Sequence, residues 1–230
     1  DQTARLIEHF SDLFTLYPFA NEKYGHSMAP IGGGMEHQTM TTQSTFTFTL
    51  TAHELAHQWF GDNVTCASWQ DIWLNEGFAS YSEFLALQNR SENAAQNWMA
   101  NAHAWAKQAL TGSLRVPDTT NVSRIFDSRI TYKKGAAVVH MLRNEINNDE
   151  LFFQSLRNYQ TQYSGKTAST ADLQRVLEET TGKDLDYFFK QWYEGEGYPI
   201  FSVQWNQEGE RMVLESTQTT TGSTPFFKTD

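Results

Sequence analysis

The sequence predicts an α+β, mostly helical fold in which a helical domain is followed by the start of a β-rich domain. Apolar residues recur at helical spacing through most of residues 52–194. Apolar and polar residues instead alternate in "TFTFTL" at 45–50, and in "IFSVQW" and "RMVLEST" after residue 199, which is typical of half-buried strands. Strands are therefore expected on both sides of a long helical region.

The helical segments follow one another with few interruptions. The first, "TARLIEHFSDLF", has apolar residues at helical spacing from Leu6 to Phe14, and the chain is then expected to be extended over 27–50. Ser169 with Asp172 resembles a capping box at one helix start, and Gly182 suits a left-handed helix stop. Further helices are expected at 52–61, 71–89, 92–110, 130–147, 149–163, 170–181 and 185–194.

Two segments depart from the helical pattern. Residues 111–129 contain Gly112, Pro117 and scattered polar residues, and they predict a long surface loop of the kind that is often functional. Near the end, "NQEGE" separates the two alternating segments and predicts a hairpin turn. We therefore expect a boundary near Gly197, with one domain at 1–198 and the truncated start of a β-sandwich-like domain at 199–230.

Composition and charge exclude several classes of protein. The 230 residues are 39% hydrophobic and include 16 Phe, 9 Tyr and 7 Trp, enough for a large core and too many for a disordered chain. The net charge of −10 repels phosphate backbones, so nucleic acid is not expected as a partner and cationic ligands fit better. No apolar run reaches about 18 residues, so no membrane span is expected.

The single cysteine and the two chain ends give further expectations. Cys66 has no partner for an internal disulfide, cannot by itself form a thiolate zinc site, and is expected to be a small buried hydrophobe. The chain begins at Asp1 without a signal-like segment and ends in the polar run "PFFKTD", which predicts a piece of a longer protein with other domains. The Thr- and Gln-rich, Lys-poor composition favours a bacterial protein outside the cytoplasm, with a cytoplasmic protein as the alternative.

The segment "HELAHQWF" carries the strongest chemical signal. His53 and His57 are four residues apart, so on a helix they share one face and can bind one metal ion. Glu54 points about 100° around that helix and can reach a water on the metal without becoming a ligand, the arrangement of zinc metalloproteases. By itself the pentapeptide also occurs by chance, with histidines that are exposed or merely packed.

The next helix supplies a third candidate ligand. Eighteen residues separate His57 from Glu76, which lies in "WLNEGFASY" between Leu74 and Phe78. A catalytic zinc site needs three protein ligands and an open position for water, and a carboxylate from a second, antiparallel helix completes that set. A solvated Glu76 is the alternative. Five aromatic residues are expected to form a dry wall around the site: Trp59, Phe60, Trp69, Trp73 and Phe78.

Four motifs, in this order along the chain, resemble the M1 family of zinc aminopeptidases, which are gluzincins with a thermolysin-like catalytic domain. "GGMEH" is similar to that family's exopeptidase motif, usually Gly-Ala-Met-Glu-Asn. "HELAHQWFGD" with "WLNEGFASY" is similar to its zinc site, and "TYKKGAAVVHML" to its catalytic-tyrosine segment. "DLDYFFKQWYEGEGYP" resembles the end of its catalytic domain, so the resemblance covers about residues 13–199.

The resemblance implies a small mixed sheet, a helical lobe and a metal helix between them. It also implies one Zn²⁺ ion on His53, His57 and Glu76, and Glu54 as the general base that activates a zinc-bound water. Tyr132 matches the tyrosine that stabilises the oxyanion. Sequence alone favours the alternative, a tyrosine in the first turn of an amphipathic helix with its hydroxyl in water, but the following Lys134-Gly135 favours the catalytic role. Lys133 stands where the family often has Glu, which we interpret as a tolerated surface difference.

The glycine-rich motif is expected to bind the substrate. The resemblance implies that Gly33, Gly34 and Met35 lie along a bound peptide as an extended edge, and that Glu36 accepts the free α-ammonium group of the substrate. The alternative is a simple turn at residues 32–34 with a solvated Glu36. His37 replaces the usual Asn of this substrate-binding motif, and we expect it to remain neutral and structural and not to bind the metal.

The function implied is a zinc-dependent aminopeptidase that hydrolyses the N-terminal residue from peptides with a free amine. Two other functions stay open at this point: an epoxide hydrolase, since relatives in the family open lipid epoxides with the same zinc, and a non-catalytic scaffold. The remaining histidines lack ligand spacing and are expected on the surface or in packing contacts: His9, His26, His103 and His140.

Overall fold

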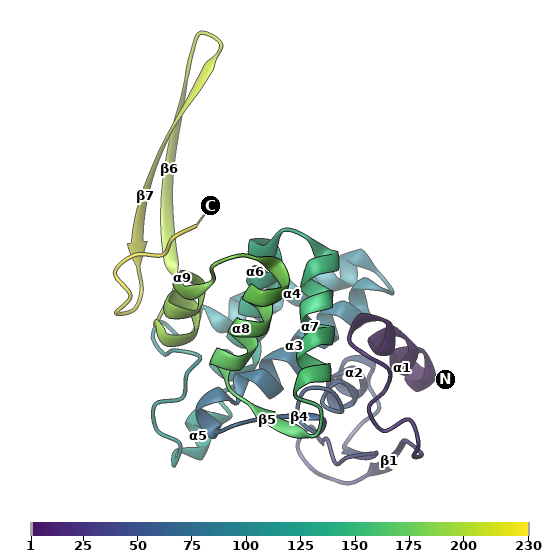
Figure 1. The fold of residues 1–230 in the computed structure, drawn as a ribbon. Helices are drawn as coiled ribbons and strands as arrows, with labels where there is room; N and C mark the ends of the chain where they lie inside the picture. The colour runs from purple at the N-terminus through teal and green to yellow at the C-terminus, as the bar shows by residue number, and fades with distance from the viewer. Residues whose placement is uncertain (1, 230) are drawn as a thin grey trace.

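Helix α3 (Trp73–Gln88) lies at the centre of the fold and is buried along almost its whole length. In the computed structural model, which describes residues 2–229, α3 contacts α2 (Phe48–Ala56), α4 (Glu92–Ala106) and α6 (Gly135–Ile146) (Figure 1). Buried residues occupy every face of α3, so it shows no polar stripe and is typical of a core helix. The helical region is therefore organised around α3 as its central helix.

The other helices complete the helical body around this central helix. Two π-helical turns interrupt the predicted α-helices at 130–147 and 185–194, so each of those segments has two parts. The other elements are α1 (Gln2–Leu13), the 3₁₀ turn η1 (Trp69–Asp71), α5 (Val122–Ile125), the π-helical turn η2 (Ser128–Lys134), α7 (Asp149–Gln162), α8 (Thr170–Thr181), α9 (Asp186–Phe189) and the π-helical turn η3 (Lys190–Glu194).

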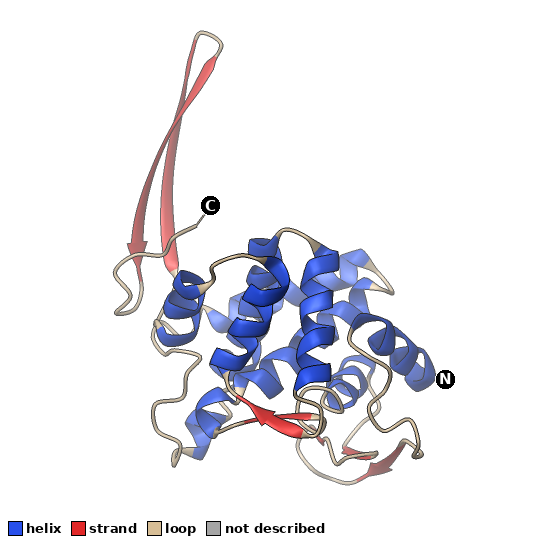
Figure 2. Cartoon of the chain, viewed as in Figure 1, coloured by secondary structure: helices blue, strands red, loops and turns tan. Residues whose placement is uncertain are grey.

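Three small sheets accompany the helices (Figure 2). The first has the order β1-β3-β2, with β1 (Gly25–Met28) parallel to β3 (Met40–Gln43) and β2 (Gly34–Met35) antiparallel to it. It is the small mixed sheet that the family resemblance implies, and β2 is one of its two edge strands. The second sheet pairs β4 (Val64–Cys66) with β5 (Lys166–Ala168) in parallel, joining segments that are far apart in the sequence.

A group of packed aromatic side chains lies in the core between α1, α2 and α3. Phe14, Trp59 and Phe60 are buried, and the ring of Phe14 lies 6.1 Å from that of Trp59 and 4.9 Å from that of Phe60. Phe60 in turn stacks on Phe78 of α3 at 4.7 Å. This packing links α1, the end of α2 and α3, and it fixes the two helices that carry the predicted metal ligands.

The predicted helix ends of α8 are confirmed. Ser169 and Asp172 form a reciprocal capping box, in which the Ser169 side chain accepts from the Asp172 backbone and the Asp172 side chain accepts from the Ser169 backbone. Gly182 ends the helix in the left-handed conformation, with φ of 71°. Both signals depend only on neighbouring residues, which is why the sequence was sufficient to predict them.

The prediction of a strand at "TFTFTL" is wrong, because helix α2 begins inside it. Thr47 is the N-cap residue, and its carbonyl accepts the Thr51 N–H at 3.0 Å. In this conformation Phe48 packs against the core while Phe46 stays 45% exposed. A short run of alternating residues does not distinguish a strand from the first turn of a helix, and here core packing decides. At its other end α2 stops at Ala56, short of the predicted residue 61.

The predicted surface loop at 111–129 is anchored more firmly than expected. It contains the short helix α5, and its buried residues Leu114, Val116 and Ile125 face the protein interior. Val116 and Ile125 pack with Ile72, the N-cap residue of α3, and with the partly buried Cys66. The apolar residues in this polar segment therefore hold it against the start of α3.

The hairpin prediction is confirmed and the hairpin projects away from the helical body (Figure 1). Strands β6 (Pro199–Glu208) and β7 (Arg211–Thr220) pair antiparallel, with Gly209 at φ of 64° in the turn. One face carries exposed apolar side chains: Phe201, Val203, Trp205, Met212 and Leu214. Among residues 2–229, no helix is long and apolar enough to cross a membrane.

Two glycines set the distance between α3 and α6. A Cβ atom on Gly135 would lie 2.9 Å from the Gly77 Cα, and one on Gly77 would lie 3.2 Å from the Gly135 backbone. The two helices therefore touch backbone to backbone, a contact that larger residues would prevent. Gly77 follows Glu76 directly, and Gly135 comes three residues after Tyr132, so this contact also sets how closely those two side chains approach.

We predict that Gly135→Ala lowers the free energy of unfolding by about 1–3 kcal/mol, because the new methyl group forces the two helices apart. Urea unfolding followed by circular dichroism measures the change. Gly32→Ala is the control, since its Cβ would meet nothing within 4 Å. Equal stability of both variants and the unmodified protein would contradict a close-packed contact at this position.

Candidate active site

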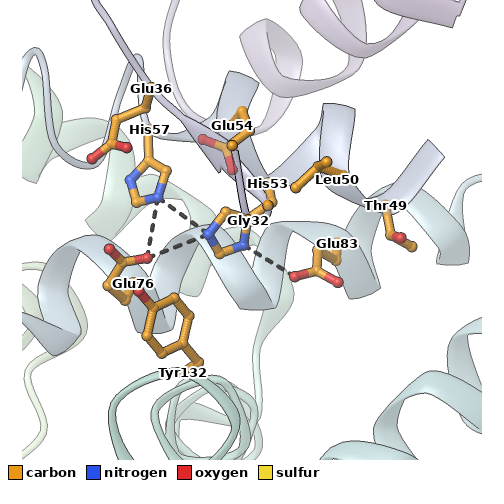
Figure 3. Close-up of a pocket in the computed structure, with 12 residues that line it drawn as sticks. Gly32, Glu36, Thr49, Leu50, His53, Glu54, His57, Glu76, Glu83 and Tyr132 are labelled. Atoms are coloured by element: carbon orange, nitrogen blue, oxygen red, sulfur yellow. Dashed lines mark hydrogen bonds and ion pairs between the residues drawn. The ribbon is translucent and has the colours of Figure 1, made fainter. Parts of the chain in front are cut away.

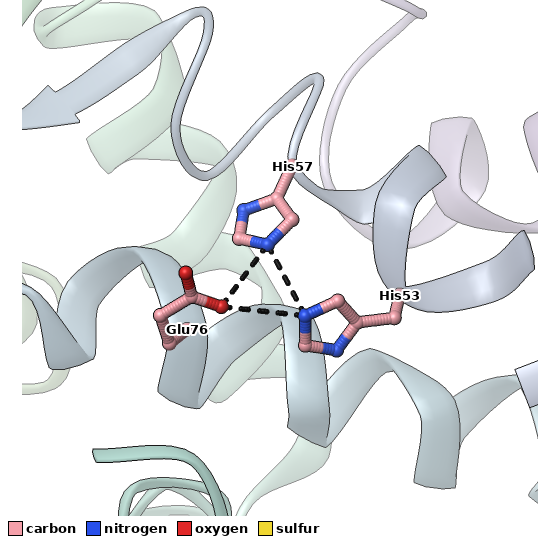
Figure 4. Close-up of side chains that lie close together, drawn as sticks. All are labelled: His53, His57 and Glu76. Atoms are coloured by element: carbon pink, nitrogen blue, oxygen red, sulfur yellow. Dashed lines mark hydrogen bonds and ion pairs between the residues drawn. The ribbon is translucent and has the colours of Figure 1, made fainter. Parts of the chain in front are cut away.

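The predicted metal ligands lie together where α2 meets α3. His53 is in the last turn of α2, His57 is its C-cap residue, and Glu76 is in the first turn of α3. The two Nε2 atoms are 3.2 Å apart, and Glu76 Oε2 lies 3.3 Å from that of His53 and 3.2 Å from that of His57 (Figure 4). Three potential ligand atoms thus form a nearly equilateral triangle, with all three residues buried.

The outer nitrogen of each imidazole has an acceptor of its own. His57 Nδ1 lies 3.0 Å from the Phe60 carbonyl oxygen, and His53 Nδ1 lies 3.0 Å from Glu83 Oε1. A carbonyl and a carboxylate accept protons, so both Nδ1 atoms act as donors and the Nε2 atoms point into the triangle. This is the orientation that a metal-binding imidazole needs.

The triangle fits a tetrahedral zinc ion. Ligand atoms about 2.0–2.1 Å from an ion at tetrahedral angles are separated by about 3.3–3.4 Å, and the three distances here are 3.2, 3.2 and 3.3 Å. Two imidazoles and one carboxylate form a ligand set that zinc enzymes use, with the fourth position left for water. The same triangle would be unfavourable for three uncharged side chains, because two nitrogen lone pairs would face each other.

The charges around the triangle favour a bound cation. Burial lowers the pKa of His53, but its hydrogen bonds to Glu76 and Glu83 outweigh burial and raise the pKa to about 9. Burial is likewise outweighed at His57, where the charge of Glu76 and a hydrogen bond to it raise the pKa to about 10. Burial opposes ionisation of Glu76, yet the two imidazoles hold its pKa well below the usual range. The carboxylates therefore favour positive charge in the triangle, either as protons on the two imidazoles or as a metal ion.

Glu54 lies beside the triangle and against the glycine-rich segment (Figure 3). Its side chain is buried, and burial raises its pKa, as do the charges of Glu36 and Glu76. A Cβ atom on Gly34 would clash with the carboxylate of Glu54. Because Gly34 has no side chain, the Glu54 carboxylate fits beside it. The sequence did not indicate this role of Gly34.

Tyr132 approaches the triangle from the turn η2. Its ring stacks on that of His53 with centroids 6.0 Å apart, and it lines the same cavity as Glu76. Burial and the charge of Glu76 raise the pKa of Tyr132, so its hydroxyl stays protonated. The alternative of a solvent-facing tyrosine is therefore wrong, because the π-helical turn directs this side chain toward the ligands (Figure 3).

Glu36 completes the polar end of a cavity of about 380 Å³ that also contains Glu54 and all three residues of the triangle. One carboxylate oxygen each from Glu36 and Glu54 lies within 4.8 Å of a His57 ring nitrogen. The backbone carbonyl of Glu36 accepts a hydrogen bond of 3.3 Å from the buried side chain of Gln58. Gln58 was missed in the sequence, although it directly follows His57 in the motif.

The glycine-rich segment is extended only in part, over the two residues of β2. Gly34 and Met35 pair with β3, while Gly32, Gly33 and Gly34 line the cavity. Gly33 adopts a φ of 79°, and its carbonyl accepts hydrogen bonds from the backbone and side chain of Ser44, both at 2.9 Å. This segment is thus more than a turn, because one side of it pairs with the sheet and the other borders the cavity.

His37 lies away from these groups. Its side chain is exposed, and its Nδ1 atom is 3.3 Å from Thr42 Oγ1. It is absent from the residues that line the cavity and from the triangle of potential ligands. The structure therefore does not bring His37 to the site, and its expected place among the substrate-binding residues is not supported by this geometry.

A second, more apolar cavity of about 780 Å³ adjoins the first beyond Glu36 and Tyr132. Its apolar wall includes Met35, Trp69 and Phe126, and the rings of the last two are 5.8 Å apart. Trp69 is 49% exposed, so its expected burial in the dry wall is wrong: it lies in a 3₁₀ turn before α3 and faces this cavity. The other four aromatic residues of that prediction are buried.

Two further functional candidates were missed or misinterpreted in the sequence. Glu83 lies seven residues after Glu76, two helical turns along the same face of α3, a spacing that could have identified it. Lys133, expected to be an ordinary surface residue, has its ammonium 3.6 Å from Glu83 Oε1. Both belong to the surroundings of His53. The remaining histidines lie on the surface or in packing contacts, as predicted: His103 is exposed, and His140 contacts the Tyr81 hydroxyl at 3.1 Å.

The comparisons with known proteins all indicate the same family. A model of the peptidase family M1 domain matches residues 1–192. The chain is 36% identical over 162 residues to aminopeptidase N of Lactococcus lactis subsp. lactis, covering 66% of this chain and 19% of that protein. It is also 36% identical over 174 residues to aminopeptidase M1-A of Oryza sativa subsp. japonica, covering 73% of this chain and 19% of that protein.

Solved structures give the same result for the fold. The M1 zinc metallopeptidase of Deinococcus radiodurans superposes with a TM-score of 0.75 at 34% identity, covering 84% of this chain and 44% of that one. A variant of that enzyme bound to a Tyr-Ser-Ala substrate superposes with a TM-score of 0.74 at 33% identity, covering 83% of this chain and 43% of that one. The chain spans about a fifth of the length of the two curated relatives above.

We predict that zinc affinity falls as the pH is lowered from about 8 to about 6, by roughly one to two log units per pH unit, because zinc must displace protons from His53 and His57. Both pKa values are raised, to about 9 and about 10, so the metal-free rings are protonated across this range. Competition with a chromophoric chelator measures the affinity. His103→Ala, remote from the triangle, should follow the same curve, and a pH-independent affinity would contradict this ligand set.

Proposed function

The chain belongs to peptidase family M1, and from this premise we propose that it is a zinc-dependent aminopeptidase that removes the N-terminal residue from peptides. One observation carries the proposal: a metal-ligand triangle, a buried carboxylate and an unpaired second carboxylate share a single cavity. The first two provide for hydrolysis, and the third provides for recognition of a positively charged chain end.

The metal centre would use His53, His57 and Glu76 as ligands. When bound, zinc supplies a Lewis acid that polarises the substrate carbonyl and makes water a stronger nucleophile near neutral pH. The ligand residues are held before any metal binds, since Phe60 and Glu83 fix the outer nitrogen of each imidazole. Such outer contacts keep the ligand rings in their binding orientation.

Glu54 would act as the general base. Its carboxylate accepts a proton from the attacking water and then delivers it to the leaving amine, so one residue serves both half-steps. Burial raises the pKa of Glu54 toward the range in which a carboxylate can both accept and release a proton. Gly34 leaves the space that this carboxylate occupies.

Tyr132 would stabilise the negative charge that develops on the carbonyl oxygen. Its hydroxyl stays protonated and is directed toward the ligand triangle, so it can donate a hydrogen bond to an oxyanion there. Because the ring stacks on His53, the donor is already in place before the substrate arrives. Preorganised donors of this kind are most effective when they need not move during the reaction.

Substrate binding would use β2 and Glu36. The free edge of β2 offers backbone groups to an extended peptide, as an edge strand can. Glu36 would accept the α-ammonium group, and the neighbouring apolar cavity with Met35, Trp69 and Phe126 would accept a large apolar first side chain. An internal peptide nitrogen carries no charge, so the Glu36 carboxylate disfavours cleavage within a chain.

We further propose that residues 199–230 begin a second, β-rich domain. The apolar face of the β6–β7 hairpin, with Phe201, Trp205 and Leu214 at its centre, is exposed over 45–68% of each side chain. A two-stranded hairpin is marginally stable alone, and an exposed apolar strand face favours association. Further strands packed on this face would give the hairpin the core that it lacks.

We predict that Glu54→Gln lowers kcat by about 10²–10⁴-fold, because the amide cannot accept the proton of water. Zinc content, measured by atomic absorption, should stay at the level of the unmodified protein, since Glu54 is not a ligand. Glu179→Gln, an exposed residue on α8, is the matched control and should keep full activity. Full activity of Glu54→Gln would remove the proposed base, and inactivity of the unmodified protein with zinc bound would support a scaffold.

We also predict that the enzyme cleaves phenylalanine amide at least about 10²-fold faster than N-acetylphenylalanine amide, because only the first carries the ammonium that Glu36 binds. In Glu36→Gln the kcat/KM for the free amine should fall toward that of the acetylated compound. Liquid chromatography of the released phenylalanine derivative measures both rates. Equal cleavage of the two amides by the unmodified protein would indicate an endopeptidase and reject the role of Glu36.

A further inference from the structure

Glu83 stands behind the metal-ligand triangle and connects several elements. Its side chain is 12% exposed, and it projects from α3 two turns after Glu76. One carboxylate oxygen, Oε1, lies 3.0 Å from His53 Nδ1, and the other accepts a hydrogen bond of 2.8 Å from the indole N–H of Trp98. Glu83 therefore joins α3 to the metal helix α2 and to α4.

Lys133 approaches the same carboxylate from a fourth element, the turn η2. Its ammonium nitrogen lies 3.6 Å from Glu83 Oε1 and 4.5 Å from the centroid of the Trp98 ring. The Lys133 side chain is 27% exposed, so the stem is largely covered and the charged end sits between an anion and an aromatic face. Lys133 is also the next residue after Tyr132 in the sequence.

The positive charge of Lys133 compensates the negative charge of Glu83. Glu83 and Glu76 lie on either side of the His53 ring, and Glu83 needs a positive partner because it is nearly buried. Once a metal ion occupies the triangle, His53 is a neutral imidazole, and Lys133 is then the charged group that compensates Glu83. A compensated carboxylate remains in place as the acceptor of the His53 Nδ1 proton.

We propose that Lys133 is a positioning residue of the metal centre: through Glu83 it holds the His53 ring with its Nε2 toward the other two ligands, and through η2 it couples Tyr132 to the same carboxylate. The inference rests on the metal centre of the proposed function and adds to it a residue that contacts neither metal nor substrate. Trp98 limits the positions open to the ammonium, so the ion pair keeps one geometry.

Zinc affinity of the purified protein tests this role without reference to catalysis. Lys133→Met removes the charge and keeps the stem, and we expect the zinc dissociation constant to rise about 10-fold, within the range for loss of an outer contact of a metal ligand. Lys133→Glu should raise it further by placing a second carboxylate beside Glu83. Lys133→Arg should restore most of the affinity, because a guanidinium can pair with Glu83 and stack on Trp98.

A double-mutant cycle identifies the route of the effect. If Lys133 acts through Glu83, Lys133→Met should change the zinc dissociation constant less than about twofold in a Glu83→Gln background. Lys107→Met on the exposed end of α4 is the control for loss of one positive charge and should leave the affinity unchanged. Additive effects of Lys133→Met and Glu83→Gln would overturn the inference.

The remaining outcomes separate this inference from the proposed function. If the unmodified protein binds zinc and Lys133→Met binds it equally well, the inference is overturned while the metal centre stands. A lower melting temperature of metal-free Lys133→Met with unchanged affinity would assign Lys133 to the fold alone, which also overturns it. Lys133→Gln repeats the test if the Met variant does not fold, and failure of the unmodified protein to bind zinc would reject both proposals.

Discussion

An excess of buried negative charge around two imidazoles is the constraint on which the rest of the site depends. Glu36, Glu54, Glu76 and Glu83 all line the cavity that holds His53 and His57. Carboxylates are costly to bury without positive partners. Three cations would meet this demand: a metal in the ligand triangle, the ammonium of a substrate at Glu36, and Lys133 at Glu83. Four carboxylates of this acidic chain thus surround the two imidazoles in one cavity.

The fold serves this cluster by holding two helices at a short, fixed distance. Stacking of Phe60 on Phe78 connects the end of α2 to α3, and the contact between Gly77 and Gly135 connects α3 to α6. The turn η2, which carries Tyr132 and Lys133, is π-helical and leads directly into α6. π-helical turns frequently occur at functional sites, and here one directs two neighbouring side chains toward different carboxylates.

Local signals in the sequence were sufficient for the shared face of His53 and His57 and for the ends of α8. The spacing of His53 and His57 fixes their common face, and the capping box and Gly182 act on adjacent backbone groups. Features that depend on distant contacts were not predictable in this way. "TFTFTL" becomes helical because Phe48 reaches the core, Trp69 faces a cavity, and Lys133 finds an anion on another helix. Glu83 could have been predicted from the sequence, because it lies two helical turns after Glu76 on the same face of α3.

Anomalous diffraction at the zinc edge, from crystals grown with zinc, tests the metal centre most directly. We expect one strong peak at the centre of the triangle, about 2.0–2.2 Å from each of its three ligand atoms. The ligand atoms are Nε2 of His53, Nε2 of His57 and Oε2 of Glu76. A peak only elsewhere, for example at the exposed cluster of Glu178, Asp184 and Asp186, or no peak at all, would contradict a zinc site built from these residues.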